Sequence, residues 1–469
     1  MKTRETFLLT IAGAAVAGTP ALAAHPSGKN TSKPNVVLIL VDDMGYKDTG
    51  YTGSDFYETP VIDSLAAQSM RFNQGYACAG NSAPSRACLI SGQFTPRHGV
   101  FAVFNTKRGP KDLMRLEPFP NNGNLDLSCY TIAEAMRDAG YRTGMVGKWH
   151  LGDSQHSPDV QGFDFTAVDK TQSAEEFRLS GDPKTMFKEV KAINGFMEES
   201  VAAGQPFFAY VSFHAVHTQW QATQKYIDYF EAKPAGKQHD KALYAAMIRD
   251  MDDAIDQILT KIRDLGVDEE TVIIFTSDNG GVNQTSQAPL RAFKGTLYEG
   301  GIRVPFFIHN TKLVVPGEID LPVANVDIYP TALAYAGVKP PKDKLLDGIS
   351  LKDIAAGKSK VKERPALYWH FPGYLDKPCP GGRDKDFRLR PATVLRKGDW
   401  KLHLFYEEWL LDGGWDKRAT NNSVELYNIA DDISEKYNLA NEMPQKRDEL
   451  LKEMLNWIEA NEVPLPIVK

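Results

Sequence analysis

Asn35-Val-Val-Leu-Ile-Leu-Val41, followed at once by Asp42-Asp43, is the stretch from which we derive the fold of this chain. A continuous run of β-branched and apolar residues is typical of a strand that is buried on both faces of a parallel sheet. Similar runs, which predict further strands, occupy residues 142–146, 207–213, 271–276 and 304–308.

Helical patterns separate these runs. Thr59 followed by Pro60 is typical of a helix start, and apolar residues recur at helical spacing along residues 243–265. Strands that alternate with helices over residues 34 to about 340 predict an α/β fold, a doubly wound and mainly parallel sheet with helices on both faces. We expect this α/β domain to span residues 34–362.

Residues 363–469 carry a different pattern. Short strand patterns at 392–395 and 400–405 flank turn residues, and a final helix pattern covers 444–460. This order predicts a smaller C-terminal α+β subdomain, an antiparallel sheet covered by one helix. We find no internal repeat and no low-complexity linker, so we expect the two parts to pack closely.

Acids and an amide follow two of the predicted strands. Asp42 and Asp43 end the first strand, and Asp278-Asn279 follow the strand at 271–276. Ligands bind at the carboxyl edge of open α/β sheets, and adjacent carboxylates repel one another unless a cation lies between them. Solvated turns are the alternative. As a metal site, this all-oxygen set favours Ca²⁺ or Mg²⁺ over zinc.

The segment Asn81-Ser-Ala-Pro-Ser-Arg-Ala-Cys-Leu-Ile-Ser-Gly92 predicts a short helix from Ser85 to Ser91, ended by Gly92. Ser82 would lie just before its N-terminus, where free N–H groups and the helix dipole favour an anion. Arg86 lies one turn further on. A serine in this position is either a helix cap or a reactive group.

Basic side chains follow two other predicted strands. Lys148 and His150 lie between two glycines after the strand at 142–146 and can project from one side of an extended segment. His214 and His217 follow the strand at 207–213. Surface or core positions are the alternative for each of these side chains.

Net charge, the N-terminal segment and the cysteine count indicate the class of partner and the cellular compartment. The 469 residues carry a net charge of −6, so the chain lacks the excess of basic residues that is typical of nucleic-acid-binding proteins. Lys2 and Arg4, an apolar core at 7–17 and Ala21-Leu22-Ala23 predict a signal peptide over residues 1–23, and a membrane anchor is the alternative. We expect an exported protein, periplasmic or extracellular, with no membrane span after cleavage. Four cysteines allow one or two disulfides, with the pairing open.

Four separated motifs together resemble those of the type I sulfatases, in the alkaline phosphatase superfamily. The motifs are Asp42-Asp43, Ser82-Ala-Pro-Ser-Arg86, Gly147-Lys-Trp-His-Leu-Gly152, and the pair Asp278-Asn279 with Lys294-Gly295. The resemblance implies a sulfuric ester hydrolase whose residue 82 is oxidised to formylglycine by a separate maturase. It also implies one Ca²⁺, with Mg²⁺ as the alternative, and a C-terminal subdomain of the form predicted above.

The resemblance also implies roles for individual residues. Asp42, Asp43, Asp278, Asn279 and residue 82 would bind the metal ion. The catalytic set would be Ser82, Arg86, Lys148, His150, His217 and Lys294. In it the cationic groups hold the sulfate, His217 or Lys294 protonates the leaving oxygen, and His150 takes a proton from the formylglycine hydrate.

Ser82 departs from the commoner cysteine of the family. A native serine implies a maturase that accepts serine, whereas an engineered one would give an inactive variant. Two other functions remain open: a phosphoester or phosphonate hydrolase that uses Ser82 directly, and a non-catalytic binder of sulfated glycans.

The expected substrate is a sulfated carbohydrate, such as a galactose or hexosamine sulfate. Six C-terminal side chains could line a sugar pocket, with surface or core packing as the alternative for most of them: Trp369, His370, Tyr374, Arg383, Arg388 and Trp409.

Overall fold

The computed structural model describes residues 33–168, 173–359, 361 and 363–469. The predicted signal peptide, residues 1–23, lies outside these residues. None of the helices in the described part is long and apolar enough to cross a membrane. The cysteines Cys78, Cys88, Cys129 and Cys379 are all free thiols, so the structure contains none of the disulfides that we considered.

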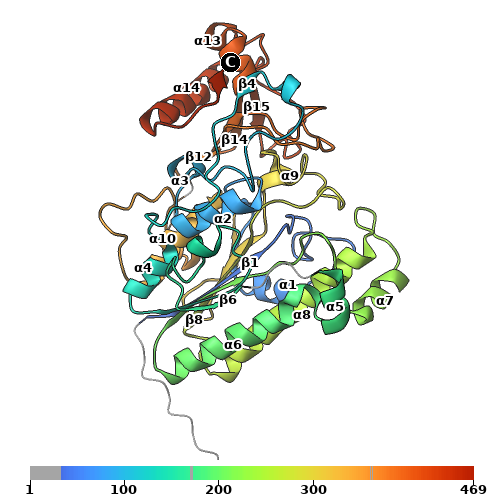
Figure 1. The fold of residues 1–469 in the computed structure, drawn as a ribbon, viewed down its shortest axis with the longest axis vertical. Helices are drawn as coiled ribbons and strands as arrows, with labels where there is room; N and C mark the ends of the chain where they lie inside the picture. The colour runs from blue at the N-terminus through green and yellow to red at the C-terminus, as the bar shows by residue number, and fades with distance from the viewer. Residues whose placement is uncertain (1–32, 169–172, 360, 362) are drawn as a thin grey trace, which may run out of the picture.

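A large mixed sheet forms the centre of the molecule (Figure 1). Within the described residues it has eight strands, which in spatial order are β10 (Gly317–Ile319), β2 (Met70–Phe72), β9 (Phe306–His309), β8 (Thr271–Ser277), β1 (Asn35–Val41), β7 (Phe207–Ser212), β5 (Arg142–Gly147) and β6 (Phe165–Ala167). The apolar run Asn35–Val41 forms β1, which pairs in parallel with β7 and with β8.

The sheet is mainly parallel, as predicted, and strand β9 is the exception. The pairs β5–β7, β5–β6 and β10–β2 are also parallel, whereas β9 runs antiparallel to both β8 and β2. The apolar run at 304–308 therefore correctly predicted a buried strand, but an apolar run carries no information about direction.

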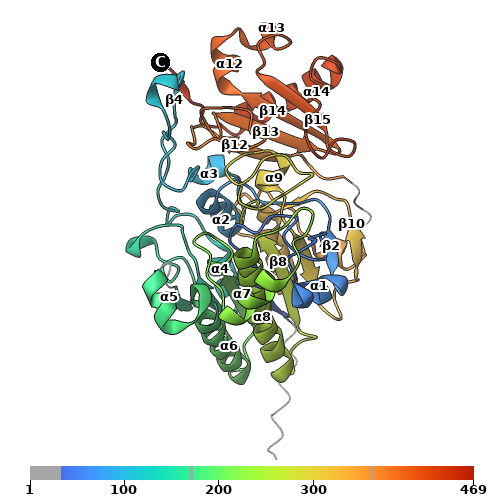
Figure 2. The ribbon, with the colours of Figure 1, turned by 90° about the vertical axis from the view of Figure 1, so that its right-hand side faces the viewer.

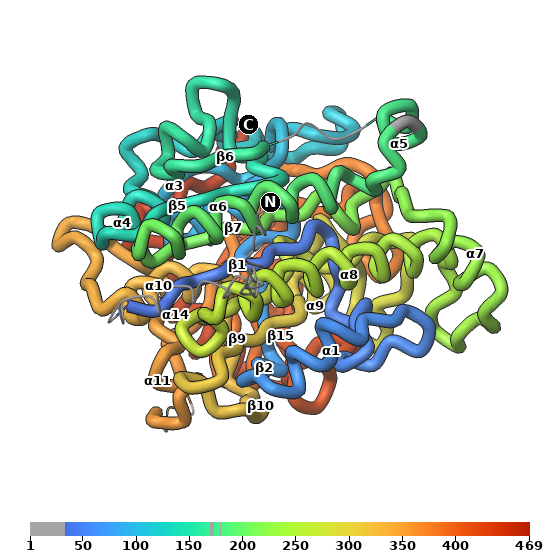
Figure 3. Tube along the Cα trace, turned by 90° about the horizontal axis from the view of Figure 1, so that it is seen from below, coloured from blue at the N-terminus to red at the C-terminus, as the bar shows by residue number. Residues whose placement is uncertain are grey.

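Helices cover both faces of the sheet because successive side chains of β1 point to opposite sides. Val36, Leu38 and Leu40 pack in one apolar cluster with α2 (Ser82–Ser91), α4 (Ile132–Asp138), α10 (Ile328–Ala336) and α11 (Lys352–Ala355). Val37, Ile39 and Val41 pack in the other with α1 (Pro60–Ala67), α6 (Met186–Ala202), α7 (Gln224–Ala232) and α8 (Ala242–Asp264). Figure 3 shows α6 and α8 side by side across the sheet. The doubly wound α/β prediction is confirmed.

Shorter elements connect these layers. They are the strands β3 (Gly75–Tyr76), β4 (Leu116–Glu117), β11 (Val323–Ala324) and β16 (Ile467–Val468); the helices α3 (Thr95–His98), α5 (Ala174–Ser180) and α9 (Glu299–Ile302); and the 3-10 turns η1 (Lys111–Leu113), η2 (Ser154–His156), η3 (Pro183–Thr185) and η4 (Asn325–Asp327). Strand β3 pairs with β11, and β4 pairs with β16.

A second, antiparallel sheet lies at the C-terminal end of the molecule (Figure 2). Its strands follow one another in the order β12 (Leu367–Phe371), β13 (Ala392–Lys397), β14 (Trp400–Phe405) and β15 (Val424–Asn428). The predicted final helix is α14 (Pro444–Ala460), which packs its apolar side into the cluster formed by this sheet. Two short helices, α12 (Tyr406–Leu411) and α13 (Gly414–Lys417), complete this part. The division at 362/363 falls between α11 and β12 and stays a prediction.

A buried charge network joins the antiparallel sheet to helix α9 and strand β3 of the α/β part. The Lys401 ammonium on β14 lies 2.9 Å from a carboxylate oxygen of Glu299 on α9 and 2.9 Å from one of Glu435, and all three side chains are fully buried. Tyr76 on β3 donates a hydrogen bond of 3.0 Å to Glu299. Glu299 also pairs with Arg303 at 3.2 Å, so loss of the Lys401 charge would leave Glu299 with one cation and Glu435 without a lysine, and breaking a buried pair in this way is costly.

We expect replacement of Lys401 by Met to lower the free energy of unfolding by up to about 3–5 kcal/mol, because Glu435 would lose its lysine partner and Glu299 would keep only the ion pair with Arg303. Urea denaturation measures the change. The control is Lys397→Met on β13, which removes the surface pair with Glu453 and should change stability by about 1 kcal/mol or less. Equal effects in the two variants would contradict a structural role for the network.

Candidate active site

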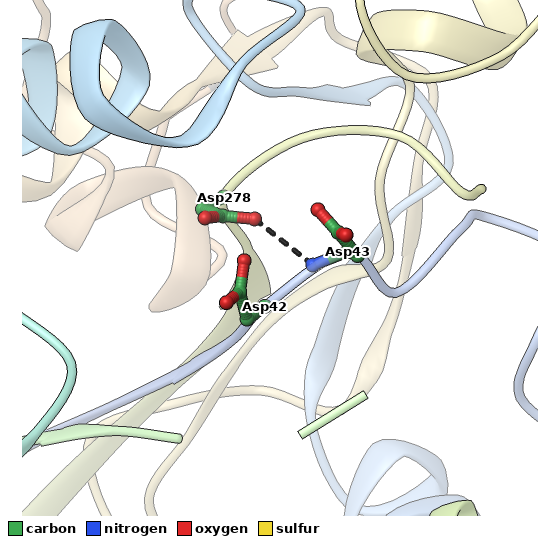
Figure 4. Close-up of side chains that lie close together, drawn as sticks. All are labelled: Asp42, Asp43 and Asp278. Atoms are coloured by element: carbon green, nitrogen blue, oxygen red, sulfur yellow. Dashed lines mark hydrogen bonds between the residues drawn. The ribbon is translucent and has the colours of Figure 1, made fainter. Parts of the chain in front are cut away.

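Three buried carboxylates meet at the carboxyl edge of the large sheet (Figure 4). Oxygens of Asp42, Asp43 and Asp278 lie within 4.8 Å of one another. The Asp43 backbone N–H donates a hydrogen bond of 3.0 Å to Asp278 Oδ1. Because β1 and β8 are adjacent and parallel, their C-terminal ends bring these acids together, as the sequence predicted.

The Ser82 side chain, at the start of α2, faces these carboxylates. Ser82 is the first residue of α2 and is 1% exposed, with Oγ 3.1 Å from Asp42 Oδ1 and 3.2 Å from Asn279 Oδ1. The helix therefore begins three residues earlier than Ser85, where we predicted it. Pro84 fits within its first turn because backbone N–H groups there need no helical partner.

The oxygen atoms around Ser82 fit a cation. A serine hydroxyl has one proton, yet two acceptor oxygens lie within 3.2 Å of Ser82 Oγ. A hard divalent ion, which prefers carboxylate, amide and hydroxyl oxygens, would relieve this crowding of acceptors.

The pKa values of the acids reflect the same crowding. Burial and the neighbouring charge of Asp42 raise the pKa of Asp278 to about 6. Burial would also raise the pKa of Asp42, but the charges of Lys148 and Arg86 outweigh it and hold this pKa well below its usual range. The ionised form of Asp278 is therefore disfavoured even beside these cations, and a bound divalent cation would favour it.

Two lysines flank the carboxylates. Lys148 Nζ lies 2.5 Å from Asp42 Oδ2, and Lys294 Nζ lies 2.5 Å from Asp43 Oδ1. Burial lowers the pKa of Lys294, but the carboxylate of Asp43 more than compensates and raises it. Lys294 is therefore charged, and both lysines lie within reach of an anion bound at this edge.

Close backbone contacts hold the Lys294 loop against the start of α2. Gly295 adopts a positive φ of 89°, and its N–H donates a hydrogen bond of 2.7 Å to the carbonyl of Gly80. A side chain at Gly80 would come within 2.5 Å of the Thr296 carbonyl oxygen, so only glycine permits this approach.

The two predicted histidines occupy different environments. Burial, together with the charge of Lys148, lowers the pKa of His150 to about 3, so this imidazole is neutral and can accept a proton. His217 is more exposed, and its Nε2 lies 3.7 Å from Asp43 Oδ2. His150 has a positive φ of 62°, so the extended segment that we predicted around Lys148 is not regular, although both side chains line one cavity.

Arg86 lies behind the carboxylates. It is fully buried, its Nε donates to Asp278 Oδ2 at 2.9 Å, and its Nη2 lies 3.6 Å from Asp42 Oδ1. It also donates to the Lys148 carbonyl and to Ser212 Oγ. Arg86 lines neither cavity described below, so its contacts position the acids and the Lys148 backbone.

Two cavities open on either side of this centre. The first, of about 900 Å³, is lined by Asp42, Lys148, His150 and Lys184 among others, and we call it the Lys184 cavity. The second, of about 450 Å³, is lined by Asp43, Lys294, Arg108 and Arg388 among others, and we call it the Arg388 cavity. His217 and Thr218 line both, so the cavities adjoin at these residues.

Of the six candidate sugar-binding side chains, only Arg388 lines one of these two cavities. Trp369, His370 and Tyr374 are buried in the packing of the C-terminal part. Arg383 pairs with Glu408 and Glu425, and Trp409 packs against the apolar cluster of the antiparallel sheet. Packing was the alternative that we had left open for most of the six.

Lys184 and Ser212 also lie at this site, although neither is among the residues predicted from the sequence. Ser212 is the last residue of β7 and donates to the Lys148 carbonyl at 2.7 Å, which a strand-end pattern could have indicated. Lys184 lies in a turn before α6, and its sequence surroundings give no sign that it reaches the centre. His214 also lines the Lys184 cavity, in agreement with its predicted position after β7.

Known proteins resemble this chain over almost its whole length. Residues 34–338 match the family model described as Sulfatase, and residues 292–461 match the model described as N-sulphoglucosamine sulphohydrolase, C-terminal. A protein of Formosa agariphila named Sulfatase is 30% identical over 96% of this chain and 93% of its own length. N-acetylgalactosamine-6-sulfatase of Mus musculus is 28% identical over 82% of this chain and 74% of its own length. The crystal structure of Ps i-CgsB in complex with k-i-k-neocarrahexaose is 26% identical, with a TM-score of 0.72 over 93% of this chain and 95% of that one.

We expect Ca²⁺ added to metal-stripped protein to raise its melting temperature, because a ligand that binds only the folded state stabilises it. In Asp43→Asn, which keeps the shape of the side chain but removes a charge, this increase should be much smaller. The matched control is Asp153→Asn at the exposed mouth of the Lys184 cavity, which should keep the full increase. Equal Ca²⁺-dependent shifts in both variants would contradict a metal site at the three carboxylates.

Proposed function

The chain belongs to the sulfatase family and is a sulfuric ester hydrolase, and from this premise we propose that it removes sulfate from a sulfated carbohydrate. We propose further that it uses a formylglycine made from Ser82 and one bound divalent cation, Ca²⁺ or alternatively Mg²⁺. The observation that carries the proposal is the position of Ser82, buried at the start of α2 and facing Asp42 and Asn279.

Two groups would complete this site. When bound by Asp42, Asp43, Asp278, Asn279 and residue 82, the cation would polarise the sulfate and the group at residue 82. As a hydrate, a formylglycine would offer two hydroxyls on one carbon, one to attack sulfur and one to release the sulfate, which splits one hard displacement into two easier steps.

The side chains of this chain supply the remaining requirements. Lys148 and Lys294, which flank the carboxylates, would hold the negative charge of the sulfuryl oxygens. His217, the more exposed histidine, would protonate the leaving oxygen, with Lys294 as the alternative donor. Neutral His150 would take the proton from the group at residue 82. Arg86 would act as a positioning residue, since its hydrogen bonds go to Asp278 and to the Lys148 carbonyl.

A sugar substrate is supported by relatives and by the space around the centre. One relative is named for an N-acetylgalactosamine sulfate, and one similar structure was solved with a neocarrahexaose. The two adjoining cavities, of about 900 and 450 Å³, provide space for sugar units on both sides of Ser82. We propose a galactose or hexosamine sulfate as the unit that is cleaved.

Export and maturation complete the proposal. The charged start, apolar core and Ala-x-Ala site of residues 1–23 support an exported protein, periplasmic or extracellular. The partner would be a maturase that oxidises serine at position 82. The net charge of −6 gives no support for a nucleic-acid partner.

The Ser82 hypothesis predicts that turnover depends on oxidation of this residue. Protein produced with a serine-accepting maturase should lose two hydrogens at residue 82, detected by mass spectrometry of the peptide, and should turn over an aryl sulfate many times. Protein with unmodified Ser82 should keep its fold and its cation but show almost no turnover, because one hydroxyl cannot both attack and release sulfate. Multiple turnover by unmodified protein would contradict the formylglycine mechanism. If that protein were also more active on a matched aryl phosphate, the result would favour a phosphoester hydrolase that uses Ser82 directly.

The two flanking lysines predict a charge effect on the reaction. Lys148→Ala and Lys294→Ala should each lower kcat on an aryl sulfate by about 10²–10³-fold, because each removes a fixed cation next to the sulfuryl group. Lys191→Ala, at an exposed position of α6, is the control and should leave kcat unchanged. Near-normal kcat in both site variants would show that the lysines do not hold the sulfate.

A further inference from the structure

Lys184 differs from Lys148 and Lys294 because its ammonium group forms no ion pair with any carboxylate in the described part of the chain. Its side chain lines the Lys184 cavity and is 2% exposed. Among the residues that the structure describes, no carboxylate forms an ion pair with its ammonium group, whereas Lys148 and Lys294 each have a carboxylate oxygen at 2.5 Å. Burial of an ammonium group without a counter-charge costs free energy, which suggests that this position is retained for binding an anion.

The surrounding acids do not supply that counter-charge. Burial lowers the pKa of Lys184, and the charge of Asp42 offsets this only in part. Asp42 itself already pairs with Lys148, and Asp43 pairs with Lys294. Asp153 and Asp159 line the same cavity but are exposed, and Asp153 is bonded to His156. An anion that enters the cavity is therefore the partner that Lys184 lacks.

The backbone around Lys184 holds its side chain in this place. Lys184 and Thr185 both adopt positive φ angles, of 55° and 61°, which non-glycine residues rarely adopt. The Lys184 N–H donates a hydrogen bond of 2.9 Å to Gln221 Oε1, and Asp182 accepts hydrogen bonds from the first backbone N–H groups of α6. Such strain persists only where the surrounding contacts enforce it, and it is typical of binding sites.

The cavity also adjoins the point at which sulfate would be cleaved. Asp42, Lys148, His150 and His217 line the same cavity as Lys184. A substrate whose sulfate lies between Lys148 and Lys294 can therefore extend into the space in front of Lys184. Resting on the proposed sulfatase function, we propose that the Lys184 ammonium binds a second anionic group of the substrate, a sulfate ester or a carboxylate carried beside the sulfate that is removed.

The test compares kcat/KM on matched sugars with one and two anionic groups. The substrates are a hexosamine monosulfate, the corresponding disulfate, and monosulfated disaccharides with either a uronate or its neutral sugar. Wild-type protein should prefer a dianionic substrate. In Lys184→Met the ratio of dianionic to monoanionic kcat/KM should fall by about 10- to 100-fold, the value of a charge-assisted hydrogen bond. Lys184→Arg should retain most of the preference, and the control Lys191→Met all of it.

The outcomes separate the two sources of the anion and the two proposals. A reduced ratio only for the disulfate identifies a second sulfate, and a reduced ratio only for the uronate identifies a carboxylate. An unchanged ratio in Lys184→Met, or a wild type without preference, would overturn the role of Lys184. If the wild type hydrolyses none of these sulfates, the proposed function fails. Lys184 is then tested by calorimetry on Ser82→Ala protein. Adding Lys184→Met should weaken binding of the dianionic sugar more than binding of the monoanionic sugar. Equal weakening of both, or no weakening, would overturn the inference.

Discussion

Repulsion among three buried carboxylates is the constraint on which the rest of this structure depends. Asp42, Asp43 and Asp278 lie within 4.8 Å of one another, and buried like charges at such distances cannot all ionise without nearby cations. Arg86, Lys148 and Lys294 supply part of that positive charge. A divalent ion bound among the carboxylate oxygens would reduce their repulsion further, so the arrangement of cationic side chains and the proposed metal site follow from one requirement.

The C-terminal sheet contributes to the site through the segment that carries Lys294. Glu299, five residues beyond Lys294, is held by Lys401 of β14, and the Gly295 N–H is bonded to Gly80 just before the α2 helix. The antiparallel sheet thus buttresses the loop that flanks the carboxylates. This explains physically why the two parts of the chain pack closely.

The two cavities differ in ways that matter for substrate choice. The Arg388 cavity contains several exposed or carbonyl-bonded cations, whereas the Lys184 cavity contains a buried ammonium that forms no ion pair within the described residues. An exposed cation is stabilised by water and requires no ligand, but a buried one gains most from a bound anion. On this proposal, selectivity for a second anionic group is set by the Lys184 cavity.

The sequence by itself determined the layered α/β fold, the later antiparallel sheet and most of the site, because each depends on local pattern. Buried strands appear as apolar runs, and polar residues at the ends of parallel strands must meet at one edge, which placed Asp42, Asp43, Asp278 and Asn279 together. The tertiary structure alone decided the reversed direction of β9, the enclosed position of Arg86 and the entry of Lys184 into a cavity. These features depend on which distant segments pack against one another, and no periodicity along the chain records that.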